Sequence, residues 1–388
     1  MMHMPVTSVT KRNVLLVVGL AVFIDMFIYG LIVPILPTYA ISLGISQTEI
    51  GLLFSSYAIT LFIATPILGM ISDRIGRKTP LLFGLIGLAV TTLLFTFATS
   101  FWMLVLARSL QGIAAAATWT AGLALLAEVH PEAERGKVMG LALSGQAAGT
   151  LLGPTIGGWL FEWGGYQLPF LVAVALALLD GIMRITLLKN VPDSHSEASP
   201  SPIFVIRNIP LLIIAGVVMI GAAIPTVLEP TLPIHLSQVF GASPGVIGLL
   251  FAVPTISYGL FAPLIGTLST NIGHKKMITL GIILVALVLP LHAIANGLWL
   301  ITGLLALLGV GIGMILAPSL PKMTQLSHES GHHSLGLTFA LFNTAYSLGM
   351  MLGPLGASIL TDTSSITFAY AVVSLFLLFY LLVLRRLK

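Results

Sequence analysis

The chain has 388 residues, of which 57% are hydrophobic and only 8% are charged. So few charges cannot cover the surface of a water-soluble protein, so the composition predicts that lipid surrounds the chain. The formal net charge of +4 at pH 7 would suit a nucleic-acid ligand, but the positions of the basic residues exclude that interpretation.

Apolar segments of about 20 residues recur along the chain, and most are long enough to cross a hydrocarbon core of about 30 Å. They do not alternate with period two, as the spans of a membrane β-barrel would. The sequence therefore predicts an all-α membrane protein with about twelve transmembrane helices in two six-helix bundles. The expected ranges are 14–37, 48–70, 79–98, 101–127, 137–161, 167–188, 209–236, 244–268, 277–295, 298–320, 334–360 and 365–384.

The basic residues indicate how the chain crosses the membrane. Apart from Arg108 and Arg184, which fall inside predicted helices, every Lys and Arg lies at a terminus or in alternate connections, and the opposite connections have none. By the positive-inside rule, both termini are cytoplasmic. The positive charge is therefore a topology signal, and we expect no nucleic-acid partner.

The first predicted helix carries a carboxylate, Asp25. At about 1.5 Å per residue it lies roughly 16 Å from a helix start near Val14, close to the bilayer midplane. An acid at that depth costs several kcal/mol unless it faces a polar cavity or is protonated. Asp25 is thus a candidate for binding substrate or a proton. The alternative is a neutral acid with a structural hydrogen bond to a neighbouring helix.

A basic turn, GMISDRIGRK, follows the second predicted helix. We predict that Asp73 and the arginines Arg74 and Arg77 form a switchable ionic latch, with simple topology-setting charge as the alternative. Gly69 and Gly76 are expected to set the backbone geometry of this turn, so all five residues are candidates for a conformational role.

The fourth predicted helix contains the stretch RSLQG. Arg108 is costly in lipid without a carboxylate or carbonyl partner, so we expect it to face the cavity or to anchor the first helix. Trp119, on the same helix, is a candidate for lining the cavity. The acids at the cytoplasmic end of this helix, Glu128, Glu132 and Glu134, are expected to be mainly solvated or paired with Arg135 and Lys137.

The fifth predicted helix contains GTLLGPTIGG, whose small residues allow close packing. Pro154 is expected to bend it, and Gly149, Gly153 and Pro154 are predicted to act as a hinge or seal between the halves. In the sixth helix, Asp180 and Arg184 are spaced i to i+4 and are expected to neutralise each other.

The halves are joined by the only long stretch of low hydrophobicity, which includes DSHSEASPSP. It predicts an N-terminal bundle over 1–189, a cytoplasmic linker over 190–208 and a C-terminal bundle over 209–388.

The seventh predicted helix carries a second membrane carboxylate, Glu229, between Pro225 and Pro230, with Pro233 beyond. Three prolines break the helix near the acid, and irregular backbone at membrane depth belongs where it lines a cavity. Glu229 is therefore a candidate equal to Asp25. His235 could pass protons, although a lone His near a helix end is more typical of a structural role.

Aromatic residues near a buried carboxylate suit an organic cation, because each cation–π contact contributes about 0.5 to 2 kcal/mol. Taken singly, aromatic residues in membrane helices are more typical of packing. On the second, eighth and eleventh predicted helices, the residues predicted to shape the cavity are Tyr57, Phe251, Tyr258, Asn343 and Tyr346.

The chain is internally duplicated. Gly51–Lys78 recurs as Gly248–Lys275, and GTLLGPTIGG recurs as GMMLGPLGAS. Repeats of this size made of apolar segments are typical of transporters built from two related halves around a central site. The second copy of the basic turn has Thr270, Asn271 and His274 at the positions of Asp73, Arg74 and Arg77.

Three of these motifs, GMISDRIGRK, RSLQG and GTLLGPTIGG, resemble those of the major facilitator superfamily, in particular its drug:proton antiporter branch. A finer match, carried by DMFIYGLIVPILP, LEPTLPIHL, ERGKVMGLAL and LLDG, is similar to the vesicular monoamine and acetylcholine transporters. The resemblance implies that Asp25 binds the substrate ammonium and that Glu229 helps bind it or the proton. It also implies that Arg108, Phe251 and Tyr258 shape the site.

The sequence departs from the vesicular pattern at three positions. Tyr57 replaces a lysine, and Leu316 and Asn343 replace membrane aspartates, which puts the proton relay of that family in question. The loop after the first helix is short, so the chain resembles a bacterial relative in a plasma membrane.

We therefore expect a monomeric transporter that exchanges protons for cationic or lipophilic amines by alternating access. It would use the proton gradient and no cofactor or metal. The alternatives are a proton-coupled exporter of neutral drugs and a metabolite carrier of the same fold. An enzyme, a channel and an ATP-driven pump are disfavoured, because the sequence has no catalytic triad, metal-ligand cluster, pore-lining acidic ring or phosphate-binding loop.

Overall fold

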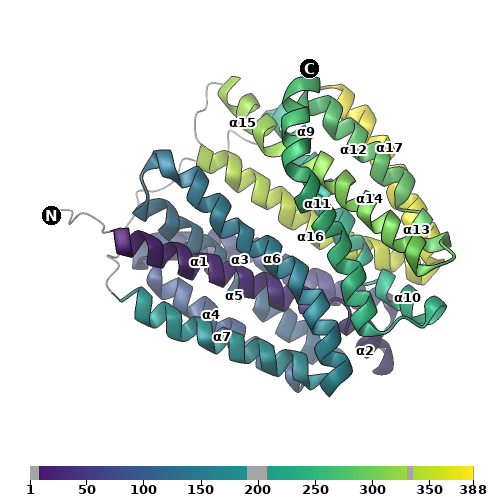
Figure 1. Cartoon of the computed structure of the whole chain (residues 1–388), viewed down its shortest axis with the longest axis horizontal. Helices are drawn as coiled ribbons and strands as arrows, with labels where there is room; N and C mark the ends of the chain where they lie inside the picture. Colours follow the sequence, from purple (N-terminus) through teal and green to yellow (C-terminus); the bar gives the residue numbers. More distant parts are fainter. Residues whose placement is uncertain (1–7, 190–207, 330–334, 388) are drawn as a thin grey trace. The chain divides into compact units, whose positions relative to one another are not determined.

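The computed structural model describes residues 8–189, 208–329 and 335–387, and these residues are almost entirely helical (Figure 1). The helices are α1 (Ser8–Leu31), α2 (Leu36–Ser42), α3 (Gln47–Ile75), α4 (Lys78–Thr96), α5 (Phe101–Val129), α6 (Glu132–Gly164), α7 (Gln167–Leu187), α9 (Ile209–Leu228), α10 (Leu232–Phe240), α11 (Pro244–Ile272), α12 (His274–Val288), α13 (Leu291–Ile294), α14 (Leu298–Leu316), α15 (Ser319–Glu329), α16 (Leu335–Thr363) and α17 (Ile366–Arg385).

Ten helical segments of the described chain are long and apolar enough to cross a membrane. The glycine-containing helices α6 and α16 are the other two long helices, with 33 and 29 residues. The all-α membrane fold predicted from the sequence is confirmed.

The chain divides into two compact units. Unit 1 contains residues 1–35 and 59–198, and unit 2 contains residues 36–58 and 199–388. The units differ from the predicted bundles in that α2 and the start of α3 group with the second half. One reason is the hydrogen bond of 2.7 Å from Ser55 Oγ to the Met351 carbonyl of α16. The predicted linker lies outside the described residues, except for Asn208, which caps α9.

Unit 1 is held together by long helix pairs. α1 packs along α6 and also contacts α5 and α7, while α4 packs against α5 and α7 (Figure 1). Its core includes the fully buried Val17 and Val18 of α1, Leu81 of α4 and Leu126 of α5. These are aliphatic side chains on facing helical stripes, as helix packing requires.

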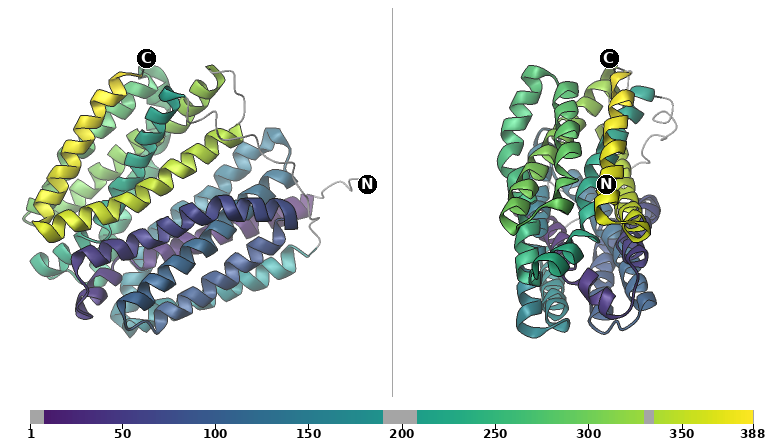
Figure 2. Two further views of the ribbon diagram at one scale, coloured as in Figure 1. Left: turned by 180° about the vertical axis from the view of Figure 1, so that it is seen from behind. Right: turned by 90° about the vertical axis from the view of Figure 1, so that its right-hand side faces the viewer.

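Unit 2 repeats these pairings. α9 packs along α16, and α12 packs against α14 and α17. Figure 2 shows α16 and α17, in yellow-green and yellow, joined by a short turn. The core includes Ile214 and Val218 of α9, Ile278 and Ile282 of α12, and Leu305 of α14. The common pairing follows from the internal duplication of the sequence.

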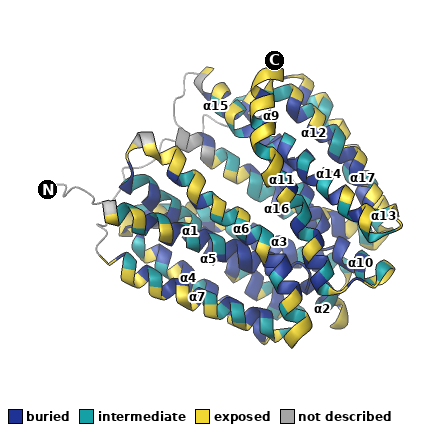
Figure 3. Ribbon diagram, in the orientation of Figure 1, coloured by how far each residue is buried: buried dark blue, intermediate teal, exposed yellow. Residues whose placement is uncertain are grey.

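Figure 3 shows exposed residues along one side of several helices. Many of these exposed residues are large and apolar. On α4 these are Phe83, Ile86 and Val90, and on α7 they include Leu178, Ile182 and Ile185. The spacing of three or four residues puts each set on one helix face. Such stripes are costly in water and suit contact with lipid tails.

Candidate functional site

Asp25 is buried in α1 of unit 1, with 1% of its surface exposed. Its Oδ2 accepts a hydrogen bond of 2.7 Å from the indole Nε1 of Trp119 on α5. An indole nitrogen only donates, so this contact stabilises the carboxylate more than a neutral acid. Two residues that the sequence offered as separate candidates are therefore in direct contact.

Arg108, also on α5, is fully buried in unit 1. Its Nη1 donates a 2.8 Å hydrogen bond to Gln111 Oε1, one turn along the helix. The guanidinium carbon lies 4.7 Å from the centre of the Tyr29 ring on α1. A cation at that distance is attracted by the ring's electrons. Arg108 thus contacts the helix that carries Asp25, as expected, through an aromatic ring.

Sequence reasoning missed both of these partners. Gln111 stands in the quoted RSLQG motif, and its i+3 spacing from Arg108 was an available signal. Tyr29 lies on a different helix, so no spacing in the sequence could have linked it to Arg108.

The depth of Asp25 is fixed by close contact between α1 and α6. A Cβ added to Gly149 or Gly153 of α6 would lie closer than 3.0 Å to the carbonyl oxygens of Phe23 and Phe27, respectively. Gly145 and Gly157 extend this glycine face toward Gly19 and Leu31 in the same way. The close packing expected of these small residues thus occurs inside unit 1. Their role as a hinge stays a prediction.

Pro154 lies within this contact. A Cβ added to Gly30 of α1 would lie 2.8 Å from Pro154 Cδ, so the proline ring occupies the space that Gly30 leaves open. α6 continues through Pro154 as one helix from Glu132 to Gly164.

In unit 2, Glu229 lies where the seventh predicted helix breaks. α9 ends at Leu228 and α10 begins at Leu232, so the helix interruption predicted from Pro225, Pro230 and Pro233 is present. The Glu229 side chain is 8% exposed. The prolines lack the N–H groups that a continuous helix needs, and the backbone at the break holds the acid at the helix end.

Aromatic side chains gather around Tyr346, which lies near this acid. Tyr346 of α16 lies within electrostatic reach of both Glu229 and Tyr258 of α11. The Phe342 ring, one turn before Tyr346, stacks on it with ring centres 6.3 Å apart. Glu229, Tyr258 and Tyr346, each singled out from the sequence, thus form one cluster. Phe342, an aromatic residue of the same helix that the sequence also offered, belongs to it as well.

Three further candidates take different places in unit 2. Phe251 is half-buried and packs against the unit 2 core, and Tyr57 is buried, with 1% of its surface exposed. Asn343 is exposed, and no side-chain hydrogen bond ties it to the described residues. Their roles in a cavity stay predictions.

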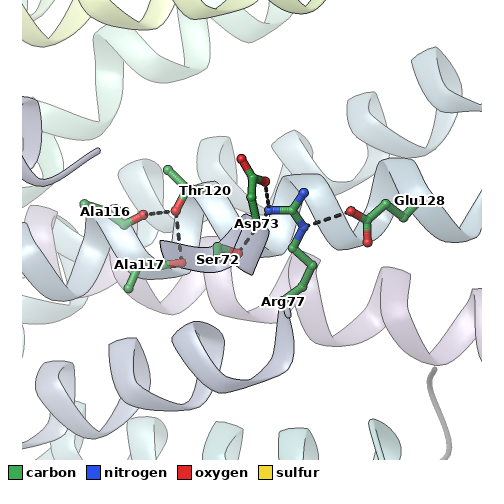
Figure 4. Close-up of polar contacts among 7 residues, drawn as sticks. All are labelled: Ser72, Asp73, Arg77, Ala116, Ala117, Thr120 and Glu128. Carbon is green, nitrogen blue, oxygen red and sulfur yellow. Dashed lines mark hydrogen bonds and ion pairs between the residues drawn. The ribbon is translucent and has the colours of Figure 1, made fainter. Parts of the chain in front are cut away.

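An ionic cluster lies at the turn between α3 and α4 of unit 1 (Figure 4). Arg77, in the turn before α4, contacts Asp73 at 2.5 Å, Glu128 at 2.8 Å and Ser72 at 3.2 Å. Burial alone would lower the pKa of Arg77, but its hydrogen bonds and the charges of Glu128 and Asp73 raise it above its ordinary value. The guanidinium therefore stays charged and bridges α3 to α5.

One expectation about the acids near this cluster was wrong, whereas Glu134 is exposed to solvent as expected. Glu128 pairs with Arg77, not with Arg135 or Lys137, because the end of α5 lies beside the turn between α3 and α4. Glu134 pairs with Lys11 at 3.4 Å. Arg135 instead donates from Nε to the Ala127 carbonyl.

The other residues of the basic turn divide into two groups. Gly76 has φ +90° and its counterpart Gly273 has φ +96°, a conformation that side chains strongly disfavour. Arg74 is exposed and takes no part in the cluster. A Cβ on Gly69 would meet nothing within 4 Å, so nothing in the structure explains a glycine there.

Asp180 and Arg184 form the predicted pair within α7, at 2.5 Å and fully buried. Arg184 Nη1 also donates a 2.6 Å hydrogen bond to the Leu81 carbonyl of α4. This pair joins two helices of unit 1, and its second link, to α4, could not be inferred from the spacing. No cluster suitable for a metal ion occurs among the described residues.

Family comparison accounts for this arrangement of helices and motifs. The family model of the Major Facilitator Superfamily matches residues 18–229 and 211–388. The chain belongs to this superfamily. Solved structures share the fold: a bacterial homologue of the human lysosomal transporter Spinster superposes with a TM-score of 0.79 at 14% identity over 98% of each chain. The nucleoside transporter NupG gives 0.75 at 17% identity, over 96% of this chain and 98% of that one.

Curated relatives include vesicular transporters. The human chromaffin granule amine transporter is 32% identical over 309 residues, or 79% of this chain, and the human synaptic vesicular amine transporter is 33% identical over 313 residues. The matches span only 59% and 60% of those two proteins. The zebrafish probable vesicular acetylcholine transporter-B is 30% identical over 89% of this chain and 73% of that protein. The chain is thus a multi-pass membrane protein related to vesicular amine transporters.

Proposed function

We propose that this protein is a secondary active transporter that exchanges protons for cationic, lipophilic amines by alternating access. The observation that carries the proposal is the pair of buried membrane carboxylates, Asp25 and Glu229, each set among aromatic side chains. Its similarity to transporters named for amines supports the same cargo class.

The carboxylates supply the coupling. A charged carboxylate in a site of low dielectric attracts an ammonium strongly, whereas a protonated one attracts it little. Protonation from the extracytoplasmic side therefore releases the amine, and loss of the proton to the cytoplasm restores the charge that binds the next one. One acid cannot be charged and neutral at once, so exchange needs no contact between proton and amine.

The neighbouring residues have distinct roles in this scheme. Trp119 holds Asp25 by a hydrogen bond to Oδ2. Tyr346, with Tyr258 close to it, offers a ring near Glu229 for an ammonium. Arg108 adds positive charge to unit 1 and contacts α1 through Tyr29. The Arg77 cluster is the cytoplasmic latch, whose ion pairs form and break as the transporter changes conformation.

The partners of the protein follow from this function. They are a small organic cation, protons and the lipid bilayer, and the energy source is the proton gradient without a cofactor. We place the protein in a bacterial plasma membrane as a monomer, and we assign it no enzymatic activity.

Uptake into proteoliposomes tests the proposal. The full chain is reconstituted with an imposed proton gradient, and uptake of labelled phenylethylamine is compared between wild type, Asp25→Asn and Glu229→Gln. We expect at least a tenfold loss in either variant, because each removes the charge that a proton would neutralise. Glu162→Gln, which changes an exposed acid at the end of α6, is the matched control and should transport normally.

Two results would overturn the proposal. Wild type that ignores the amine but moves a neutral drug or metabolite would favour the alternative cargoes. Full gradient-driven uptake in the double variant Asp25→Asn/Glu229→Gln would exclude these acids as the coupling groups.

A further inference from the structure

A pocket of about 340 Å³ lies within unit 2. Its walls come from α2, the start of α3, the break before α10, α10 itself, the end of α16 and the start of α17. Since the end of α3 carries the basic cytoplasmic turn, its start faces the opposite, extracytoplasmic side. The polar lining residues are Gln47, Thr231, His235, Gln238, Thr361 and Asp362, and three isoleucines complete the wall.

Hydrogen bonds fix the shape of this pocket. Asp362 Oδ2 accepts from the Thr48 hydroxyl at 2.6 Å and from the Thr48 amide at 3.3 Å. Gln47 Nε2 donates to the Pro230 carbonyl at 3.0 Å and to Ser358 Oγ at 3.2 Å. The second set ties the pocket wall to the residue that follows Glu229. The pocket is therefore preorganised and lies next to the helix break.

Two polar atoms of the lining residues have unused hydrogen-bonding capacity. His235 Nε2 and Thr361 Oγ1 are buried and have no hydrogen-bond partner within the part of the chain that the structure describes. Buried polar atoms in proteins nearly always have a partner. Both atoms belong to residues that line the pocket, so rotation of either side chain into another rotamer would present its free atom to a bound molecule.

The acceptors in the pocket match an ammonium group. A primary ammonium has three N–H donors, and a neutral imidazole nitrogen, a hydroxyl and the Asp362 carboxylate can each accept one. The isoleucines suit the apolar part of the same molecule. A pocket of this size is at the small end of ligand sites, which span about 300 to 1,000 Å³, so it suits a small amine better than a multi-ring drug.

We propose that this pocket is a second, outer binding site for a small organic ammonium, held by Asp362, His235 and Thr361. Cargo occupies it on the extracytoplasmic side of Glu229, on leaving the protein or on entering in the reverse direction. The identity of the cargo rests on the proposed function. The site itself rests on the pocket and its acceptors.

Amine exchange measured separately at each face of the membrane tests the outer site. Amine-for-amine exchange of labelled phenylethylamine needs no proton gradient and is measured in right-side-out and inside-out membrane vesicles. His235→Leu and Thr361→Val should each raise KM about tenfold for amine offered at the extracytoplasmic face, as loss of a hydrogen bond to a charged group predicts. KM for amine offered at the cytoplasmic face should not change.

Conservative variants distinguish the loss of a contact to the amine from a disturbance of the pocket structure. His235→Gln and Thr361→Ser keep a polar atom and should restore most of the outer-face affinity. Glu49→Gln alters an acid at the same end of α3 whose hydrogen bonds are to Ser46, and it should leave KM at both faces unchanged. An unchanged outer-face KM in both His235→Leu and Thr361→Val would overturn the site, and so would equal increases at both faces.

Failure of the proposed function is distinguishable from failure of the site. If wild type exchanges no phenylethylamine, saturation-transfer NMR measures its binding to the full chain in lipid nanodiscs. Binding that is lost in Thr361→Val but kept in Asp25→Asn/Glu229→Gln supports the pocket, and no binding at millimolar amine overturns it.

Discussion

The two units share a helix arrangement but differ in what they bury. Unit 1 buries Asp25, Arg108 and the Asp180–Arg184 pair. Among the described residues of unit 2, Glu229 is the only buried Asp, Glu, Lys or Arg. The shared pairing of α1 with α6 and of α9 with α16 depends on glycines in both units. The difference teaches that small residues maintain the helix pairing that both units share. The buried charges of unit 1 are not needed for that pairing, so they require a different explanation.

The basic turn gives the same lesson at a smaller scale. Gly76 and Gly273 both have positive φ, so both copies need glycine for the turn. The Arg77 cluster has no counterpart in the second copy, where His274 stands at the equivalent position. Because the turn forms without the charges, we attribute the cluster to conformational control.

The largest expected effect comes from removing one partner of a buried ion pair in unit 1, which leaves the other charge buried and unpaired. Asp180→Asn removes the carboxylate but leaves Arg184 buried, which should cost about 3 to 5 kcal/mol. The double variant Asp180→Leu/Arg184→Met should lose much less, because it makes this part of unit 1 as apolar as unit 2. The apparent melting temperature of the purified protein measures both. If the double variant falls as far as the single one, the pair is essential to the fold of unit 1.

The glycine contacts should be the next most sensitive. Gly149→Ala places a Cβ against the α1 backbone and should cost about 1 to 3 kcal/mol in apparent stability. Gly140→Ala lies on the same helix, where a Cβ meets nothing within 4 Å, and should be neutral or slightly stabilising. Gly349→Ala should copy the loss in unit 2, because a Cβ there would contact the Met219 carbonyl. Equal melting temperatures for all three would refute the shared backbone contact.

An intermediate effect on amine KM should follow from removing the hydrogen bond that holds Asp25. Trp119→Phe keeps an aromatic ring but removes the donor to Oδ2, and loss of a charge-assisted hydrogen bond should change amine KM about tenfold. Trp102→Phe alters the same helix at a side chain that is 74% exposed and serves as the control. Kinetics of phenylethylamine uptake decide between them, and identical KM values would show that Trp119 only packs.

The smallest effect is expected at the cytoplasmic cluster. Glu128→Gln removes one ion pair of Arg77, and because Glu128 is partly exposed the pair contributes only about 0 to 1 kcal/mol. Uptake should change up to about fivefold, while Glu134→Gln, at an exposed pair with Lys11, should not change it. A Glu128→Gln rate equal to wild type would leave topology as the sole role of this turn.

Local sequence signals were sufficient for two features that lie within a single stretch of chain. The prolines around Glu229 predicted the helix break, and the spacing of Asp180 and Arg184 predicted their ion pair. Contacts between helices had no such signal: Trp119 donates to an acid 94 residues away, and Glu128 pairs across 51 residues with Arg77. The cost of burying charge and the chemistry of aromatic rings supplied the candidate list for the site, but packing decides which members of that list touch.

The glycine face of α6 also restricts how α1 can move. The glycines and the α1 carbonyls that they face are both spaced by four residues. Each glycine therefore packs against one carbonyl of α1, in a single matching register. A slide of half a turn would drive side chains into backbone, and the next matching register lies four residues away, about 6 Å along the axis. Continuous sliding of α1 is thereby excluded. Asp25 keeps its register on α6, and any change in which side it faces carries both helices together.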